Sequence, residues 1–164
     1  MGNGGQGIQR LLTGAAALVL MAGAAMGACR EDKVDLRGDW GSASFTVELA
    51  DDNAERSQGL MNRESMARSA GMLFAYPAPR PVRFWMRNTL IPLDMIFLDD
   101  TGTVQKVHHE AQPLDESLIY GGDAIQYVLE INGGMARQLG ISEGTELRHP
   151  AIGAGAAAWP CDTE

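Results

Sequence analysis

Cysteine is nearly absent from this sequence, which has only Cys29 and Cys161 among its 164 residues. The two thiols lie near opposite ends of the chain, outside its motif-rich centre, so a catalytic cysteine or a cysteine-ligated metal is not expected. In an oxidising compartment they could form one disulfide bond that closes a long loop. We expect this disulfide. The alternative is a lipid on Cys29, which would leave Cys161 as a lone thiol.

Histidine is also scarce, and the signature motifs of common enzyme classes are missing. The three histidines are His108, His109 and His149, and no serine stands in a motif near them. The sequence has no Walker loop, no G-x-G-x-x-G, no G-x-S-x-G and no H-E-x-x-H. Motifs therefore nominate no catalytic residue, no metal ligand and no cofactor.

Basic residues are outnumbered, with 13 Lys and Arg against 21 Asp and Glu. Removal of residues 1–28 would leave 12 basic against 21 acidic residues, a net charge of −9. A negative field repels phosphate backbones, and no basic stripe interleaved with aromatics is present. Nucleic acid is therefore not an expected partner.

Residues 1–28 have the pattern of a secretory signal peptide. Arg10 precedes an uncharged run over residues 11–28, and small residues at 25–27 suit cleavage just before Ala28. One alternative is a lipobox, because Gly27 and Ala28 precede Cys29; another is an uncleaved anchor of about 18 apolar residues. We expect a periplasmic or otherwise exported protein, which touches the membrane only through the signal peptide or a lipidated Cys29.

Short strands separated by turns predict a mainly β fold with short helices. Phe45, Val47 and Leu49 alternate with polar residues, as in a half-buried strand. Further strands are expected at residues 72–76, 84–86, 94–98, 103–111, 127–132 and 145–149, and helical turns near 51–58 and 135–139. This pattern predicts a single domain, either a small open barrel or a β-sandwich.

The remaining segments complete the expected domain organisation. A flexible lead-in is expected over residues 29–44, the β domain over 45–150, and a loose Ala/Gly-rich tail over 151–164. Three prolines in residues 77–81 predict a stiff connector, and residues 112–124 predict a loop over one mouth of the fold.

Four sequence blocks carry a resemblance to a known family. They are G-L-M-N-R at residues 59–63, G-M-L-F at 71–74, F-W-M-R-N-T-L-I-P-L-D at 84–94 and L-E-I-N-G-G at 129–134. In this order and spacing they resemble the domain of unknown function 192 family, over about residues 45–148. Arg87 stands where the family often has Lys, which keeps the positive charge. The resemblance implies a compact, mostly β fold and often export, but no reaction.

The third block crowds polar groups among apolar neighbours, which is costly unless they are paired or face a ligand. We predict a pocket for a small polar ligand, because aromatic faces with a few directed polar groups commonly hold such ligands. The alternative is a structural network in which Asp94 pairs with Arg63 or Arg87, and Asn88 and Thr89 bond local backbone. The predicted ligand-binding residues are Arg63, Phe84, Trp85, Arg87, Asn88, Thr89, Asp94 and Glu130.

Two further site hypotheses remain open. Asp94 and Glu130 could be the acid and base of a hydrolytic enzyme if burial separates their pKa values. Met61, Met72 and Met86, with His108 or His109, could bind Cu(I), although methionine commonly packs in cores. The favoured interpretation is a non-catalytic binding module of the cell envelope, for a small polar ligand or a protein partner.

Overall fold

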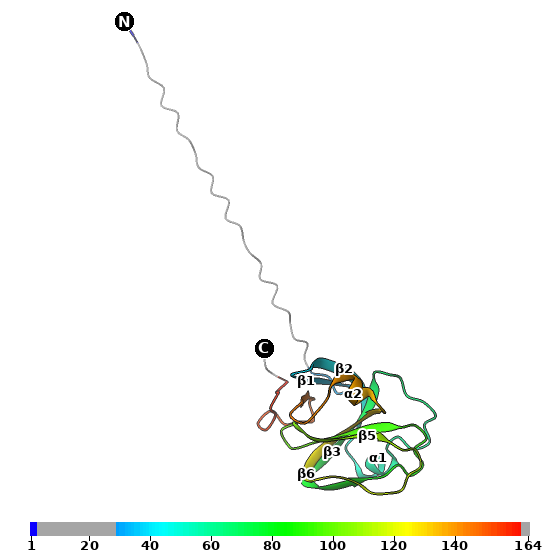
Figure 1. Cartoon of the computed structure of the whole chain (residues 1–164). Helices are drawn as coiled ribbons and strands as arrows, with labels where there is room; N and C mark the ends of the chain where they lie inside the picture. Colours follow the sequence, from blue (N-terminus) through cyan, green and yellow to red (C-terminus); the bar gives the residue numbers. More distant parts are fainter. Residues whose placement is uncertain (3–28, 162–164) are drawn as a thin grey trace.

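The computed structural model describes residues 1–2 and 29–161, so all of the predicted signal peptide except its first two residues lies outside the described residues. Within that part, the chain forms seven strands and two short helices (Figure 1). In chain order they are β1 (Lys33–Gly38), β2 (Gly41–Ala50), α1 (Asn53–Gln58), β3 (Ala70–Phe84), β4 (Leu93–Leu98), β5 (Val104–Ala111), β6 (Ile119–Asn132), α2 (Met135–Leu139) and β7 (Glu146–Arg148).

All seven strands belong to one sheet that curls into a half-barrel, with the order β5-β4-β6-β3-β2-β1-β7 (Figure 1). Only β2 and β3 pair in parallel, and the segment between them carries α1, because parallel neighbours need a crossover connection. The prediction of a mainly β single domain is confirmed, in its open-barrel form. Within the described ranges, neither helix has the length and apolar character needed to span a bilayer.

Each face of the sheet carries its own apolar core, because successive residues of a strand point to opposite faces. One cluster contains Leu73, Ile96 and Leu129, and the other contains Phe74 and Met95 together with their neighbours. The central strand β4 is buried along its whole length, which explains its near-continuous apolar sequence.

The prediction of a flexible lead-in over residues 29–44 is wrong. Residues 33–38 form β1, in which Val34 and Leu36 are completely buried. β1 pairs with β2 on one side and with β7 on the other. Gly41, with φ 117°, begins β2 directly after the tight connection from β1, and a positive φ favours glycine there. These glycine-rich residues therefore mark a hairpin.

The prediction of a loose tail is wrong for residues 151–161. Ile152 and Trp159 are buried, and the guanidinium groups of Arg37 and Arg148 each lie 4.4 Å from the Trp159 ring centroid. Cys161 forms a disulfide bond with Cys29, as predicted, so no described cysteine is free. Two large apolar anchors and a covalent bond thus fix a segment of low sequence complexity.

Two predicted connections are strand instead. Residues 77–81 belong to β3, although pairing with β6 is irregular there, with a register shift between Ala75 and Arg80. Their prolines are exposed, and the irregular pairing accommodates them because proline has no backbone N–H to donate to a neighbouring strand. β6 begins at Ile119, so the loop predicted over residues 112–124 spans only 112–118.

Candidate functional site

Glu130 lies in the middle of the sheet, on β6, where both neighbouring strands flank it. It is directly opposite Met72 of β3 and Met95 of β4. Paired residues share a face, so Glu130 points to the same face as Phe74 and Val128, whose side chains belong to an apolar core. An acidic side chain thus points to a face of the sheet on which its neighbours are apolar.

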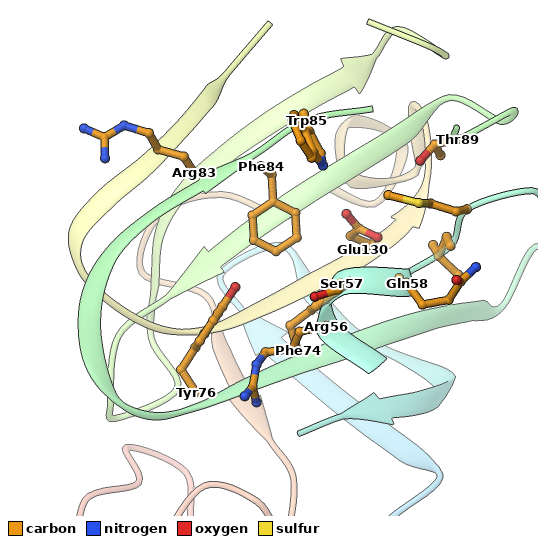
Figure 2. Close-up of a pocket in the computed structure, with 13 residues that line it drawn as sticks. Arg56, Ser57, Gln58, Phe74, Tyr76, Arg83, Phe84, Trp85, Thr89 and Glu130 are labelled. Atoms are coloured by element: carbon orange, nitrogen blue, oxygen red, sulfur yellow. The ribbon is translucent and has the colours of Figure 1, made fainter. Parts of the chain in front are cut away.

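A pocket of about 100 Å³ opens over Glu130 (Figure 2). One wall comes from the end of α1 and the turn after it, and the other from β3 and the segment after β3. The lining residues are Arg56, Ser57, Gln58, Gly59, Leu60 and Met61 on the first wall, Phe74, Tyr76, Arg83, Phe84, Trp85 and Thr89 on the second, and Glu130 between them.

The first wall is shaped by a well-defined helix. Asp52 and Glu55 form a capping box at the start of α1, and Gly59 ends the helix with a φ of 48°. A Cβ atom at Gly59 would lie 3.3 Å from the Phe74 ring. Glycine therefore allows both the turn and the close approach of the backbone to the aromatic wall.

The second wall is aromatic. The Phe84 ring meets the Phe74 ring edge to face, with centroids 5.0 Å apart, and the Phe97 ring at 6.0 Å. This contact fixes Phe84 beside Glu130 (Figure 2). Trp85 follows Phe84 and keeps 41% of its surface exposed, at the mouth of the pocket.

The carboxyl group of Glu130 has no partner among the described residues. The residue is 4% exposed, and neither a hydrogen bond nor an ion pair reaches its side chain. Burial raises the pKa of Glu130 from 4.5 to about 8, because desolvation disfavours the charged form. The group is therefore mostly protonated at neutral pH while the pocket holds no charged ligand.

The cationic side chains of the lining do not compensate Glu130. Arg56 donates to the backbone oxygens of Asp51 and Ala75 and to Asn53 Oδ1, the last two at 2.7 and 2.8 Å. Arg83 lies over the Tyr120 ring, 5.2 Å from its centroid, and its guanidinium points away from Glu130 in Figure 2.

Four of the eight predicted binding residues come together at this pocket, and four do not. Phe84, Trp85, Thr89 and Glu130 line it. Arg63 instead pairs with Glu48, with a shortest distance of 2.5 Å. Arg87 lies over the Trp85 ring, 5.5 Å from the ring centroid, and does not line the pocket. Asn88, with φ 54°, accepts a backbone hydrogen bond from the Asn62 N–H, so it serves a turn.

Asp94 has a structural role on the other face of the sheet. Its Oδ1 accepts hydrogen bonds from the backbone N–H groups of Glu110 and Gly134, and its Oδ2 accepts one from Ala136 at 2.7 Å. The carboxylate therefore ties the start of α2 to the end of β5. Neither Arg63 nor Arg87 pairs with it, and it does not face Glu130, so the geometry does not assemble the predicted acid and base pair.

The methionines of the copper hypothesis differ in their surroundings. Met72 and Met86 are buried in the apolar core, whereas Met61 lines the pocket, where its sulfur accepts a contact from the Asn88 amide. His109 Nδ1 lies 4.0 Å from Asp94 Oδ1. In the described part of the chain, no three His, Cys, Asp or Glu side chains gather as a metal site of these ligands would require.

Several lining residues were not predicted from the sequence. Arg56, Ser57 and Gln58 precede a recognised block by a few residues, and the helix cap is the signal that could have placed them at a site. Tyr76 and Arg83 lie on either side of the irregularly paired part of β3, whose prolines predicted only a stiff connector.

Comparisons with known proteins agree with the family resemblance. The model of the domain of unknown function 192 family, described as "Uncharacterized ACR", matches residues 34–149. A crystal structure of a protein of unknown function from Novosphingobium aromaticivorans DSM 12444 is 40% identical, with a TM-score of 0.69 over 70% of this chain and 82% of that one.

A second similar structure is a putative transcription regulator from Sinorhizobium meliloti 1021. It is also 40% identical, with a TM-score of 0.72 over 77% of this chain and 98% of that one. No curated protein sequence matches. On the match of the family model, which covers well over half of the sequence, the chain belongs to the domain of unknown function 192 family.

Proposed function

We propose that this protein is a non-catalytic binding module that takes a small polar group of a ligand or protein partner into the pocket over Glu130. One observation carries the proposal: a side chain that is 4% exposed, acidic and without a partner faces a cavity. A buried polar group without a hydrogen bond costs about 1–3 kcal/mol. A ligand that supplies the missing partner would recover part of this free energy on binding.

Exposed apolar side chains on the segment that includes Trp85, and on a segment bonded to it, support a partner larger than the pocket. Apart from Met1, the exposed large apolar side chains of the described residues all belong to two segments, residues 85–90 and 114–120. The segments are joined by backbone hydrogen bonds from Met86 to Asp115 and from Leu114 to Thr89. Grouped apolar side chains at a surface are typical of binding sites. They are Trp85, Leu90, Leu114, Leu118 and Tyr120.

The proposed location is the cell envelope. The signal-peptide pattern of residues 1–28 and the bond between Cys29 and Cys161 support it, since structural disulfides persist in oxidising compartments. Fractionation of the native host and an intact mass of the purified protein test this part. A protein that retains residues 1–28 in the cytoplasmic fraction would contradict it.

The binding proposal is tested by ligand-observed NMR with a panel of small amines, amides, carboxylates and sugars. We expect at least one class to bind, and binding to be lost in Glu130→Leu and weakened in Trp85→Ala. Glu64→Gln is the matched control, because Glu64 is exposed and lies outside the pocket lining. Binding that survives in Glu130→Leu, or no binding by any class, would overturn the proposal.

A further inference from the structure

We propose that the group received at Glu130 is a nitrogen cation, either a protonated amine or a guanidinium. This inference rests on the proposed binding function and names its ligand class. Of the described residues that line the pocket, Glu130 is the only acid, and it lies at the inner end between the two walls (Figure 2).

The two aliphatic hydroxyl groups of the pocket lining are arranged as hydrogen-bond acceptors. The hydroxyl of Ser57 donates its hydrogen to the Asn53 carbonyl at 2.6 Å, and the hydroxyl of Thr89 donates to the Arg87 carbonyl at 3.3 Å. Because a hydroxyl has a single hydrogen, both oxygens present only lone pairs to the pocket. A ligand that fits these lone pairs and a carboxylate must bring N–H or O–H donors.

The aromatic side chains of the walls favour positive charge over neutral donors. Phe84 and Trp85 lie beside Glu130 in Figure 2, Phe74 also lines the pocket, and the faces of aromatic rings attract cations. This protein already uses the interaction on its surface, where Arg87 lies over Trp85 and Arg56 and Arg80 lie over Tyr76. The net charge of −8 also draws cations toward the molecule.

The arginine side chains that line the pocket do not supply the cation for Glu130. The guanidinium of Arg56 is engaged by Asp51, Asn53 and Ala75, and that of Arg83 points away from Glu130. An anionic ligand could accept hydrogen bonds from Gln58, Tyr76 and Trp85, but at the inner end of the pocket it would lie against a buried carboxyl group. The volume of about 100 Å³ admits the end of a lysine or arginine side chain or a small free amine.

Binding of a cation has a defined proton balance. With the pKa of Glu130 at about 8, a cation binds the ionised form and displaces the carboxyl proton into solvent. Below pH 8 the affinity should therefore fall up to tenfold for each pH unit, because the ionised fraction falls in that proportion. A neutral ligand needs no such ionisation.

The experiment measures binding of n-propylammonium and methylguanidinium by calorimetry, at several pH values and in two buffers of different ionisation enthalpy. Acetamide and butyrate are the neutral and anionic counterparts. Capped tripeptides with a central lysine or arginine, compared with norleucine or citrulline, distinguish a protein side chain from a free amine as the source of the cation.

We expect the cations to bind with release of about one proton each near pH 7, and to lose at least tenfold in affinity in Glu130→Gln. Glu64→Gln should bind as the native protein does. Tighter binding of the basic tripeptides than of the small amines would assign the cation to a polypeptide partner, and the reverse would assign it to a free amine.

Two other results separate the two proposals. If acetamide or butyrate binds at the pocket and the cations do not, or if cation affinity does not change with pH, the cationic class is wrong while the binding function stands. If none of the probes or tripeptides perturbs the pocket residues in NMR spectra at any pH, both proposals fail.

Discussion

Asp94 and Glu130 lie on adjacent antiparallel strands, one position out of register, and their carboxyl groups therefore point to opposite faces of the sheet. Asp94 is opposite Ile131, and Glu130 is opposite Met95. On one face the carboxylate receives three backbone N–H groups. On the other face the carboxyl group receives none. Two buried acids from neighbouring strands thus have separate roles, one in holding the fold and the other in the candidate site.

The stability of the protein should depend on pH through Glu130. Its pKa is raised in the folded state, so the folded protein holds the proton more tightly than the unfolded chain. The contribution to stability is complete below about pH 4.5 and is lost as pH rises to about 8, by roughly 5 kcal/mol at most. Urea denaturation at a series of pH values measures the slope.

Glu130→Gln isolates this effect, because glutamine has nearly the same shape and does not titrate. The difference in unfolding free energy between Glu130→Gln and the native protein should move in favour of the variant as pH rises from about 5 to about 8. Glu64→Gln should show the native slope. A difference that stays constant over this range would mean that Glu130 is not desolvated.

Removal of the Asp94 side chain should destabilise the fold strongly. Asp94→Ala leaves the N–H groups of Glu110, Gly134 and Ala136 without their acceptor, at a cost of about 3–5 kcal/mol. The midpoint of urea denaturation measures the loss, and Asp51→Ala, at an exposed position, is the control. A loss as small as in the control would show that α2 and the end of β5 do not depend on this carboxylate.

Reduction of the disulfide bond should lower stability by about 2–4 kcal/mol, because the bond closes a loop across a sequence separation of 132 residues. The comparison is between the native protein with and without reductant, and the double variant Cys29→Ser with Cys161→Ser should match the reduced protein. If Cys29 carried lipid, Cys161 would react with a thiol reagent in the unfolded, unreduced protein. That reaction would contradict the disulfide.

Acidic pH should weaken the junction of β1, β2 and β7. Burial opposes ionisation of Asp35, but hydrogen bonds from Ser44, Arg148 and Lys33 outweigh it and lower the pKa of Asp35 to about 2. The stabilisation is present above the unfolded value of 3.8 and is lost as pH falls toward 2.

After allowance for partial exposure of Asp35, we expect about 1 kcal/mol from this group. Asp35→Asn should remove this part of the acid dependence of unfolding. If the unfolding free energy of Asp35→Asn fell at acidic pH as steeply as that of the native protein, Asp35 would not be the source of the loss, and other carboxylates would be.

Elements with a strong local pattern could be predicted from the sequence, and those that depend on distant partners could not. The apolar run at residues 95–98 predicts a strand over 94–98, and β4 begins only one residue earlier. β1 offers only Val34 and Leu36 as a signal, and its identity as a strand depends on pairing with β2 and β7. In the sequence Trp159 is an isolated aromatic residue, and only the structure shows that the guanidinium groups of Arg37 and Arg148 lie against its ring.

The same distinction holds for the candidate site. Glu130 could be singled out because it interrupts an apolar strand, and Phe84, Trp85 and Thr89 because they belong to a dense block. Whether Asp94 or Glu130 faces the pocket depends on which face of the sheet each residue takes. That choice required the register between β4 and β6, which a single sequence does not specify.

The bond between Cys29 and Cys161 makes the domain nearly a closed ring. Their Cα atoms lie 5.4 Å apart. A short peptide could replace the bond, and the ring could then be opened in the exposed 142–144 turn to give a circular permutant with all strand pairings retained. The order of the elements along the chain would change while the pocket remained as it is.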